Sequence, residues 1–286
     1  MNTPRRKTWL RASLATLLAL VLLGALLWPG PPQVESVTVT LPHLPAAEEG
    51  LRVAVIADFH GGFPWRRVNA VAPLVAQVNA LRPDLILLLG DMVHWSESGP
   101  EFVPALAGLR APRGVYACLG NHEHRRGWWD QAGNEPGPLS SAGWAQLYAA
   151  AGITLLNNAA RPVGGAGLWL VGVDDPRTGR QDLGAALRGV PPGACCLLLA
   201  HSPDIVDDPL APRADLIVAG HTHGGQVRLP GIPVRWGPYR HPERRAAGLD
   251  RENGTQMYVT RGVGEGLPVR FRCPREITLL TLRGPG

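Results

Sequence analysis

The sequence predicts an α/β fold, a four-layer α-β-β-α sandwich of two central mixed sheets flanked by helices, preceded by an N-terminal hydrophobic helix. Two patterns support this prediction. Short apolar runs alternate with helical stripes early in the chain, and strands dominate later. The chain has 286 residues, 45% apolar and 18% charged, which suits one large globular domain. We therefore expect a single domain over residues 34–286, after a terminal segment of residues 1–33.

The segment of residues 1–33 has the composition of a membrane anchor. Four basic side chains lie in residues 1–11. Residues 12–28 carry no charge, and this run of 17 residues is at the short limit of length for a bilayer span. We expect contact with the membrane through residues 8–28, with the rest of the protein outside the cytoplasm at the cell membrane. Export after cleavage of a signal peptide is the alternative, although the Pro-rich sequence after Trp28 is a poor cleavage site.

Hydrophobic periodicity predicts ten strands and four helices after the terminal segment. Residues 34–41 alternate apolar and polar side chains, which is typical of an edge strand. The other runs are mostly continuous and indicate buried strands. The strands are expected at residues 34–41, 51–57, 84–89, 114–119, 153–156, 168–173, 195–200, 215–219, 256–260 and 276–282. The helices are expected at residues 65–81, 101–109, 140–151 and 181–187.

Five of the predicted strands end in Asp, Asn or His side chains. The carboxyl ends of strands are where open α/β sheets bind ligands, and neutral imidazole is the commonest metal ligand. For the hexapeptide of residues 220–225 alone, a turn with two solvated histidines is the alternative to a metal site. Five such clusters in order indicate a shared site instead. The clusters are Asp58-Phe59-His60, Gly90-Asp91, Gly120-Asn121-His122-Glu123, His201 and Gly220-His221-Thr222-His223.

Charge and cysteine content exclude some classes of protein. The net charge is +5, but the first 11 residues supply four of the 28 basic groups. The remaining 24 basic groups face 23 acidic ones, so the body gives no electrostatic case for binding nucleic acid. The four cysteines match no zinc pattern, and we expect no disulfide framework.

In this order, the five clusters resemble the motifs of the calcineurin-like metallophosphoesterases over about residues 51–226. The N-terminal apolar segment, residues 223–230 and the tail at residues 258–262 and 276–280 resemble a bacterial branch that is membrane-anchored or exported. The resemblance implies two divalent ions, of Mn, Fe or Zn, because mixed nitrogen and oxygen ligands suit these metals. One ion would be held by Asp58, His60, Asp91 and His223, and the other by Asp91, Asn121, His201 and His221.

The resemblance also implies an activity. A hydroxide that bridges the ions would attack a phosphoester or pyrophosphate bond, and the membrane segment suggests a lipid-linked or cell-envelope substrate. His122 would donate a proton to the leaving oxygen, and Glu123 would orient His122 or raise its pKa by pairing with it. The alternative function is a non-catalytic metal-binding module with the same fold.

Other polar residues are expected to lie near the site or in turns without binding metal. His94 is expected to support the site or to lie in a loop, and Asp204 to cap a helix or accept a hydrogen bond behind the ligands. His124 is expected at the border of the cleft. Asp174 and Asp175 are interpreted as turn formers.

A loop with Trp128-Trp129 and Arg125-Arg126 is expected to overhang the cleft, because it follows His122 directly. We hypothesise that it contacts the leaving group or the lipid surface, since Arg pairs with phosphate and Trp favours membrane interfaces. The alternative is a loop folded on its own tryptophans.

Overall fold

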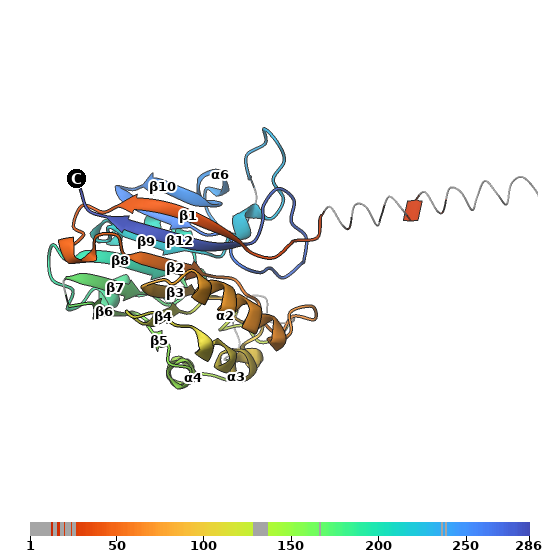
Figure 1. Ribbon diagram of the computed structural model, residues 1–286, viewed down its shortest axis with the longest axis horizontal. Helices are drawn as coiled ribbons and strands as arrows, with labels where there is room; N and C mark the ends of the chain where they lie inside the picture. The colour runs from red at the N-terminus through yellow and green to blue at the C-terminus, as the bar shows by residue number, and fades with distance from the viewer. Residues whose placement is uncertain are drawn as a thin grey trace, which may run out of the picture.

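The computed structural model describes residues 27–127, 137–165, 167–235, 237 and 239–286, with five single positions between residues 13 and 24. The predicted anchor at residues 8–28 therefore lies mostly outside the described residues. Within the described part of the chain, no helix combines the length and the apolar character that a bilayer span requires. The body contains two six-stranded mixed sheets (Figure 1).

The first sheet joins the N-terminal half of the chain to its last strand. β12 lies between β1 and β2 and runs antiparallel to β2, whereas the other pairs in this sheet are parallel. β1 is an edge strand, as its alternating pattern predicts. In spatial order the strands are β1 (Gln33–Thr40), β12 (Glu276–Arg283), β2 (Arg52–Ile56), β3 (Leu85–Leu89), β4 (Val115–Cys118) and β5 (Thr154–Leu155).

The second sheet has four parallel central strands and an antiparallel strand at each edge. Its strands in spatial order are β10 (Gly248–Glu252), β11 (Thr255–Val259), β9 (Leu216–Ala219), β8 (Cys195–Ala200), β7 (Leu168–Gly172) and β6 (Ala159–Val163). Parallel strands place their carboxyl ends at one edge of the sheet, so the loops after β8 and β9 lie together.

Alternate side chains of the central strands enter different cores. In β3, Leu85, Leu87 and Leu89 pack with residues of the second sheet such as Leu197. Ile86, from the same strand, packs with the helices outside the first sheet. Burial on both faces explains why these strands are continuously apolar.

Helices cover the outer faces of the sheets. α2 (Val71–Ala80), α3 (Gly99–Phe102) and α4 (Ser141–Ala150) lie on one side of the first sheet (Figure 1). α5 (Leu183–Ala186) and short 3-10 turns pack on the second sheet. The other turns and helices are η1 (Ala46–Glu48), η2 (Val68–Ala70), η3 (Ser96–Ser98), η4 (Pro104–Gly108), η5 (Pro176–Thr178), η6 (Pro203–Asp207), η7 (Ala211–Arg213), η8 (His223–Gly225) and α6 (Pro242–Arg245).

The predicted α/β architecture of two mixed sheets with helices is confirmed, but some boundaries differ. The helix expected at residues 65–81 begins at Val71, after the turn η2. The helix expected at residues 101–109 ends at Phe102 and continues as η4, because Pro104 cannot donate a backbone hydrogen bond. The edge strands β6 and β10 were not predicted.

Candidate metal centre

The seven predicted metal ligands leave the two sheets at the carboxyl ends of neighbouring strands. β2, β3 and β4 are adjacent in the first sheet, and β8 and β9 are adjacent in the second. Two facing sheets therefore deliver side chains to one place. The residues that follow these five strands are, in order, Asp58, His60, Asp91, Asn121, His201, His221 and His223.

One group of candidate ligand atoms comes from both sheets. Ligand atoms of Asp58, His60 and His223 lie within 4.8 Å of one another. Nε2 of His60 is 3.2 Å from Nε2 of His223, which in turn is 3.7 Å from Oδ1 of Asp58. Two imidazole nitrogens and a carboxylate oxygen that converge in this way match the ligands that transition metals prefer.

A second group lies beside the first. Ligand atoms of Asp91, His201 and His221 also lie within 4.8 Å of one another. Nε2 of His201 is 3.2 Å from Oδ2 of Asp91 and 3.0 Å from Nδ1 of His221. The same Oδ2 atom is 3.8 Å from Nε2 of His60 in the first group. Asp91 therefore stands between the two groups.

Unsatisfied polar atoms indicate that the groups fit metal ions. Oδ1 of Asn121 and Nε2 of His221 are buried without a hydrogen-bond partner in the described structure. Burial and the neighbouring His122 lower the pKa of His60 well below its usual value, and burial and the neighbouring His201 do the same for His221. These rings are therefore neutral, which is the form that binds metals. A cation would provide the missing partner of the Asn121 oxygen.

The backbone at the site adopts an unfavourable conformation. Five of the seven candidate ligands have positive φ angles, in the left-handed region that side chains with a Cβ atom rarely occupy. Such strain clusters at functional sites, where the surrounding structure enforces it. The five residues are Asp58 (58°), His60 (54°), Asp91 (52°), His221 (69°) and His223 (51°).

Two glycines let the carboxylates approach the backbone closely. A Cβ atom on Gly120 would lie 2.3 Å from Oδ1 of Asp91, and one on Gly220 would lie 2.8 Å from Oδ2 of Asp58. Distances under 3.0 Å essentially never occur for a real Cβ atom. These positions therefore require glycine for the space that the carboxylates occupy.

Backbone carbonyls fix the orientation of two candidate ligand rings. Nδ1 of His201 donates to the carbonyl of Leu89 at 2.8 Å, and Nδ1 of His223 donates to the carbonyl of Gly264 at 3.0 Å. A hydrogen bond at Nδ1 leaves the Nε2 atom of a neutral ring unprotonated and able to bind a metal. Both Nε2 atoms face the groups described above.

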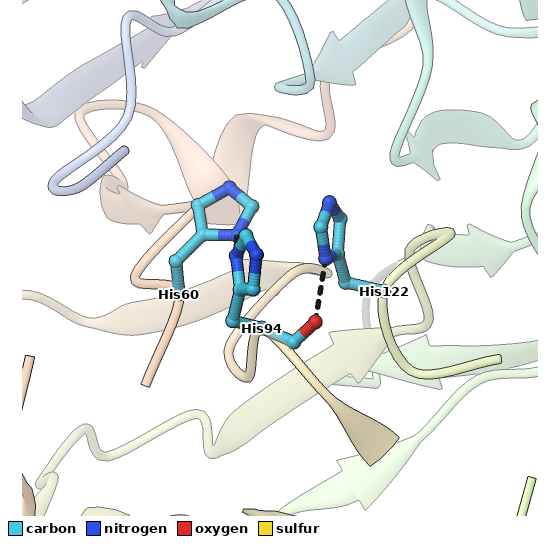
Figure 2. Close-up of side chains that lie close together, drawn as sticks. All are labelled: His60, His94 and His122. Carbon is cyan, nitrogen blue, oxygen red and sulfur yellow. Dashed lines mark hydrogen bonds between the residues drawn. The ribbon is translucent and has the colours of Figure 1, made fainter. Parts of the chain in front are cut away.

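His94 supports two site residues in different ways (Figure 2). Its Nδ1 atom is 3.0 Å from Nδ1 of His60, and its backbone carbonyl accepts a hydrogen bond of 2.7 Å from Nδ1 of His122. The three rings could themselves suggest a metal group. However, Nδ1 of His122 is a donor to a carbonyl, so we interpret His94 as a support for His60 and His122.

His122 is placed to face a bound substrate. It lines a cavity of about 380 Å³ with Asp91, Asn121, His221 and His223. Its Nε2 atom is 3.9 Å from Oδ2 of Asp91. Because its Nδ1 atom is occupied, Nε2 is the atom of His122 that is available for proton transfer.

Glu123 does not orient His122, contrary to the role we expected for it. Its carboxylate is fully buried and accepts hydrogen bonds from the backbone N–H groups of Gly120, Asp91 and Met92 at 2.8 to 2.9 Å. Burial and the nearby Asp91 carboxylate raise its pKa to about 7. The correct reading is that Glu123 holds together the loops after β3 and β4, while the His94 carbonyl orients the ring of His122.

The other polar residues singled out in the sequence lie outside the two ligand groups. Asp204 accepts from the buried Arg245 at 2.7 Å, and Arg245 also donates to Asp207 and Glu252. Asp175 caps η5 by accepting from the N–H of Thr178 at 2.8 Å. The Trp128-Trp129 loop lies outside the described residues, which resume at residue 137.

A buried ionic cluster that the sequence analysis missed supports His223. Glu265 is fully buried and pairs with Arg66 at 3.1 Å and with Arg270 at 2.8 Å. Arg270 also donates to the carbonyl of Gly264 at 2.7 Å, the same carbonyl that accepts from His223. Nothing in the periodicity around residue 265 signals this role.

Comparison with known proteins agrees with this geometry. The model of the calcineurin-like phosphoesterase family matches residues 51–225. The uncharacterized metallophosphoesterase YkuE of Bacillus subtilis is 27% identical over 84% of this chain and 82% of its own length. Phosphodiesterase YaeI of Escherichia coli is 31% identical over 81% of this chain and 82% of its own. A zebrafish protein named as a transmembrane protein with a metallophosphoesterase domain is 30% identical over 94% of this chain and 62% of its own.

These matches and the grouped aspartate and histidine side chains define a metal-dependent phosphoric ester hydrolase. More than half of the chain fits the family model, and the chain belongs to the calcineurin-like phosphoesterases.

Proposed function

We propose that the seven side chains hold two divalent metal ions, of Mn, Fe or Zn, and that the site hydrolyses phosphoester or pyrophosphate bonds. The observation that carries this proposal is the pair of ligand groups that meet at Asp91. When bound, such ions polarise phosphoryl oxygens and provide hydroxide as the nucleophile near neutral pH. The chain itself provides two carboxylates, an amide oxygen and four imidazoles.

His122 acts on the leaving group in this proposal. Burial lowers the pKa of its ring, so Nε2 is unprotonated before a substrate binds. A bound phosphate brings negative charge into the cavity, which favours uptake of a solvent proton by a neighbouring imidazole. The protonated Nε2 atom can then donate to the departing oxygen, a contribution of about 10²- to 10⁴-fold in rate. The His94 carbonyl keeps the ring pointing at the cavity throughout.

The test combines metal content with hydrolysis. The full chain is stripped with a chelator, reloaded with Mn²⁺, and assayed on nitrophenyl phosphate monoesters and diesters. We expect about two ions per chain and hydrolysis that depends on them. Asp91→Asn should lower both, because it alters the one side chain common to the two groups. Asp250→Asn, an exposed substitution beside Arg244, is the matched control. A chain that binds two ions and hydrolyses no phosphoester would instead be a metal-binding module.

We also propose that residues 8–28 hold the domain at the outer face of the cell membrane, where its substrate is lipid-linked or part of the cell envelope. The carbonyl of Leu27 accepts from the N–H of Arg270 at 2.8 Å, so the described end of this segment lies against the loop after β11. That loop exposes Leu267 and Val269, which are 66% and 36% accessible. The name of the zebrafish relative is consistent with membrane attachment.

Fractionation tests the membrane proposal. The full chain should remain with membranes after alkaline carbonate washing, and a protease added to intact spheroplasts should digest its body. A mature protein that is released in soluble form and begins near residue 29 would show cleavage of a signal peptide instead. Digestion only after lysis would place the body in the cytoplasm and contradict the proposal.

A further inference from the structure

Two arginines share the cavity of the candidate metal centre. Arg125 and Arg177 line the same space of about 380 Å³ as Asp91, Asn121 and His122. Arg125 follows β4 of the first sheet, and Arg177 lies in η5 after β7 of the second. Two guanidinium groups from different sheets therefore border one cavity. Guanidinium is the side-chain group best suited to bind phosphate oxygens.

Buried hydrogen bonds tie the segments that carry these arginines to each other. Nε2 of His124 is 2.6 Å from Oδ1 of Asp174, and both side chains are at least 90% buried. His124 immediately precedes Arg125, and Asp174 is three residues before Arg177. The same Oδ1 atom accepts from the N–H of Asp175, whose side chain caps η5. The separation of the two arginine backbones is thus set by a buried pair that has no part in holding metal.

Local contacts also restrain Arg125. Its N–H donates to the carbonyl of His122, and its own carbonyl accepts from Ser96 at 2.9 Å. Its guanidinium carbon lies 5.1 Å over the ring of Trp95, and Nη1 is 3.4 Å from Nε2 of His122. Stacking on an aromatic ring orders the plane of a guanidinium group. Arg125 is therefore held beside the atom that faces the leaving group.

A second cavity adjoins the first at Arg177. It has a volume of about 400 Å³, and its lining combines Asp204, Asp207 and Asp208 with Arg177 and Arg240. A substrate that extends past Arg177 would therefore meet polar side chains of both charges.

We propose that Arg125 and Arg177 form a subsite for a second anionic group next to the scissile phosphate, so that the substrate is a pyrophosphate or carries a neighbouring phosphate. This inference rests on the proposed function, because the first phosphate is the one held at the metal centre. Two metal ions and two carboxylates already account for one phosphate, and two further cations beside them suit a ligand with additional negative charge.

Substrate selectivity tests the subsite. The Mn²⁺-loaded full chain is assayed on UDP-glucose, which has a pyrophosphate, and on bis(p-nitrophenyl) phosphate, which has one phosphate. The ratio of the two kcat/KM values should fall about 10- to 100-fold in Arg125→Met, which removes a partly buried charge-assisted contact. It should fall about 5- to 10-fold in Arg177→Met, because that side chain is exposed and solvent weakens its contact. Arg180→Met, an exposed residue three positions later, should leave the ratio unchanged.

Binding provides a readout that does not depend on turnover. Calorimetry should show that methylenediphosphonate binds the wild-type chain more tightly than methylphosphonate, and that the double variant loses most of this preference. A double variant with an unchanged selectivity ratio and preference would overturn the subsite and leave the proposed hydrolase intact. Wild-type protein that binds both phosphonates equally would also overturn the subsite and leave the proposed hydrolase intact. Absence of all metal-dependent hydrolysis would refute the proposed function, and the subsite with it.

Discussion

Replacing Gly120 with alanine should displace the carboxylate of Asp91. The new Cβ atom would lie 2.3 Å from Oδ1 of Asp91 and 2.9 Å from Cγ of His201. Since real Cβ contacts are essentially never under 3.0 Å, the carboxylate or the loop must move by about 0.7 Å. The backbone at Gly120 is not in the left-handed region, so the effect is one of space alone.

The expected magnitude follows from this displacement. A misplacement of about 1 Å can cost roughly 10²-fold in rate, so a shift of about 0.7 Å should lower kcat/KM by tens-fold to a hundredfold. Overpacking of a filled interior costs about 1–3 kcal/mol. For a domain of this size that corresponds to a fall of roughly 2–12 °C in Tm.

The assay measures Mn²⁺ affinity by calorimetry and hydrolysis of a nitrophenyl diester, with Tm from the same preparations. Gly184→Ala is the control, because its Cβ atom would meet nothing closer than 3.4 Å and it lies in α5. Full metal affinity and full activity in Gly120→Ala would show that the site tolerates movement of Asp91. The argument from close approach would then fail.

Three further predictions concern metal, proton transfer and pH. Removing both ions with a chelator should lower Tm by roughly 10–20 °C, because each ion at a hundred times its Kd adds about 2.7 kcal/mol to the free energy of unfolding. An unchanged Tm would contradict the metal centre. His122→Ala should slow hydrolysis of alkyl phosphates about 10²- to 10⁴-fold. Hydrolysis of nitrophenyl phosphates should slow much less, because nitrophenolate leaves without a proton. Equal losses of rate on the two substrates would argue against proton donation by His122. Burial raises the pKa of Glu265, but Arg275 and Arg270 outweigh it and lower the pKa overall, so this cluster stabilises the fold above about pH 4.5 and loses that effect as pH falls. In Glu265→Gln, the fall of Tm from pH 6 to pH 3 should therefore be shallower than in the wild type.

The central strands could be predicted because burial on both faces leaves a continuous apolar signal. β3 is Leu-Ile-Leu-Leu-Leu, and every residue in it is buried. The edge strands carry no such signal. In β6, Arg161 and Pro162 are exposed, and β10 has the charged sequence Asp-Arg-Glu. Such strands exist because a neighbour offers hydrogen bonds, which a linear pattern does not display.

The candidate ligands could also be predicted, because each follows a buried strand and the strands converge. Their supports could not. The Glu123 carboxylate accepts hydrogen bonds from three backbone N–H groups instead of pairing with His122. These partners depend on how the loops pack, which the sequence pattern does not display. Glu265 acts on His223 through Gly264, 41 residues later in the chain. The positive φ angle of Asp91 could not be predicted either, because Asp adopts the left-handed region only occasionally.

The five left-handed residues at the candidate metal centre lower the stability of the domain that holds them. A left-handed conformation costs about 1–2 kcal/mol for a residue with a side chain, so together they cost about 5–10 kcal/mol. That is comparable to the whole net stability of an ordinary domain. Glycine at any of these positions would relieve the cost and abolish a ligand. Replacing one of these residues with glycine should therefore make the domain more stable while it weakens metal binding.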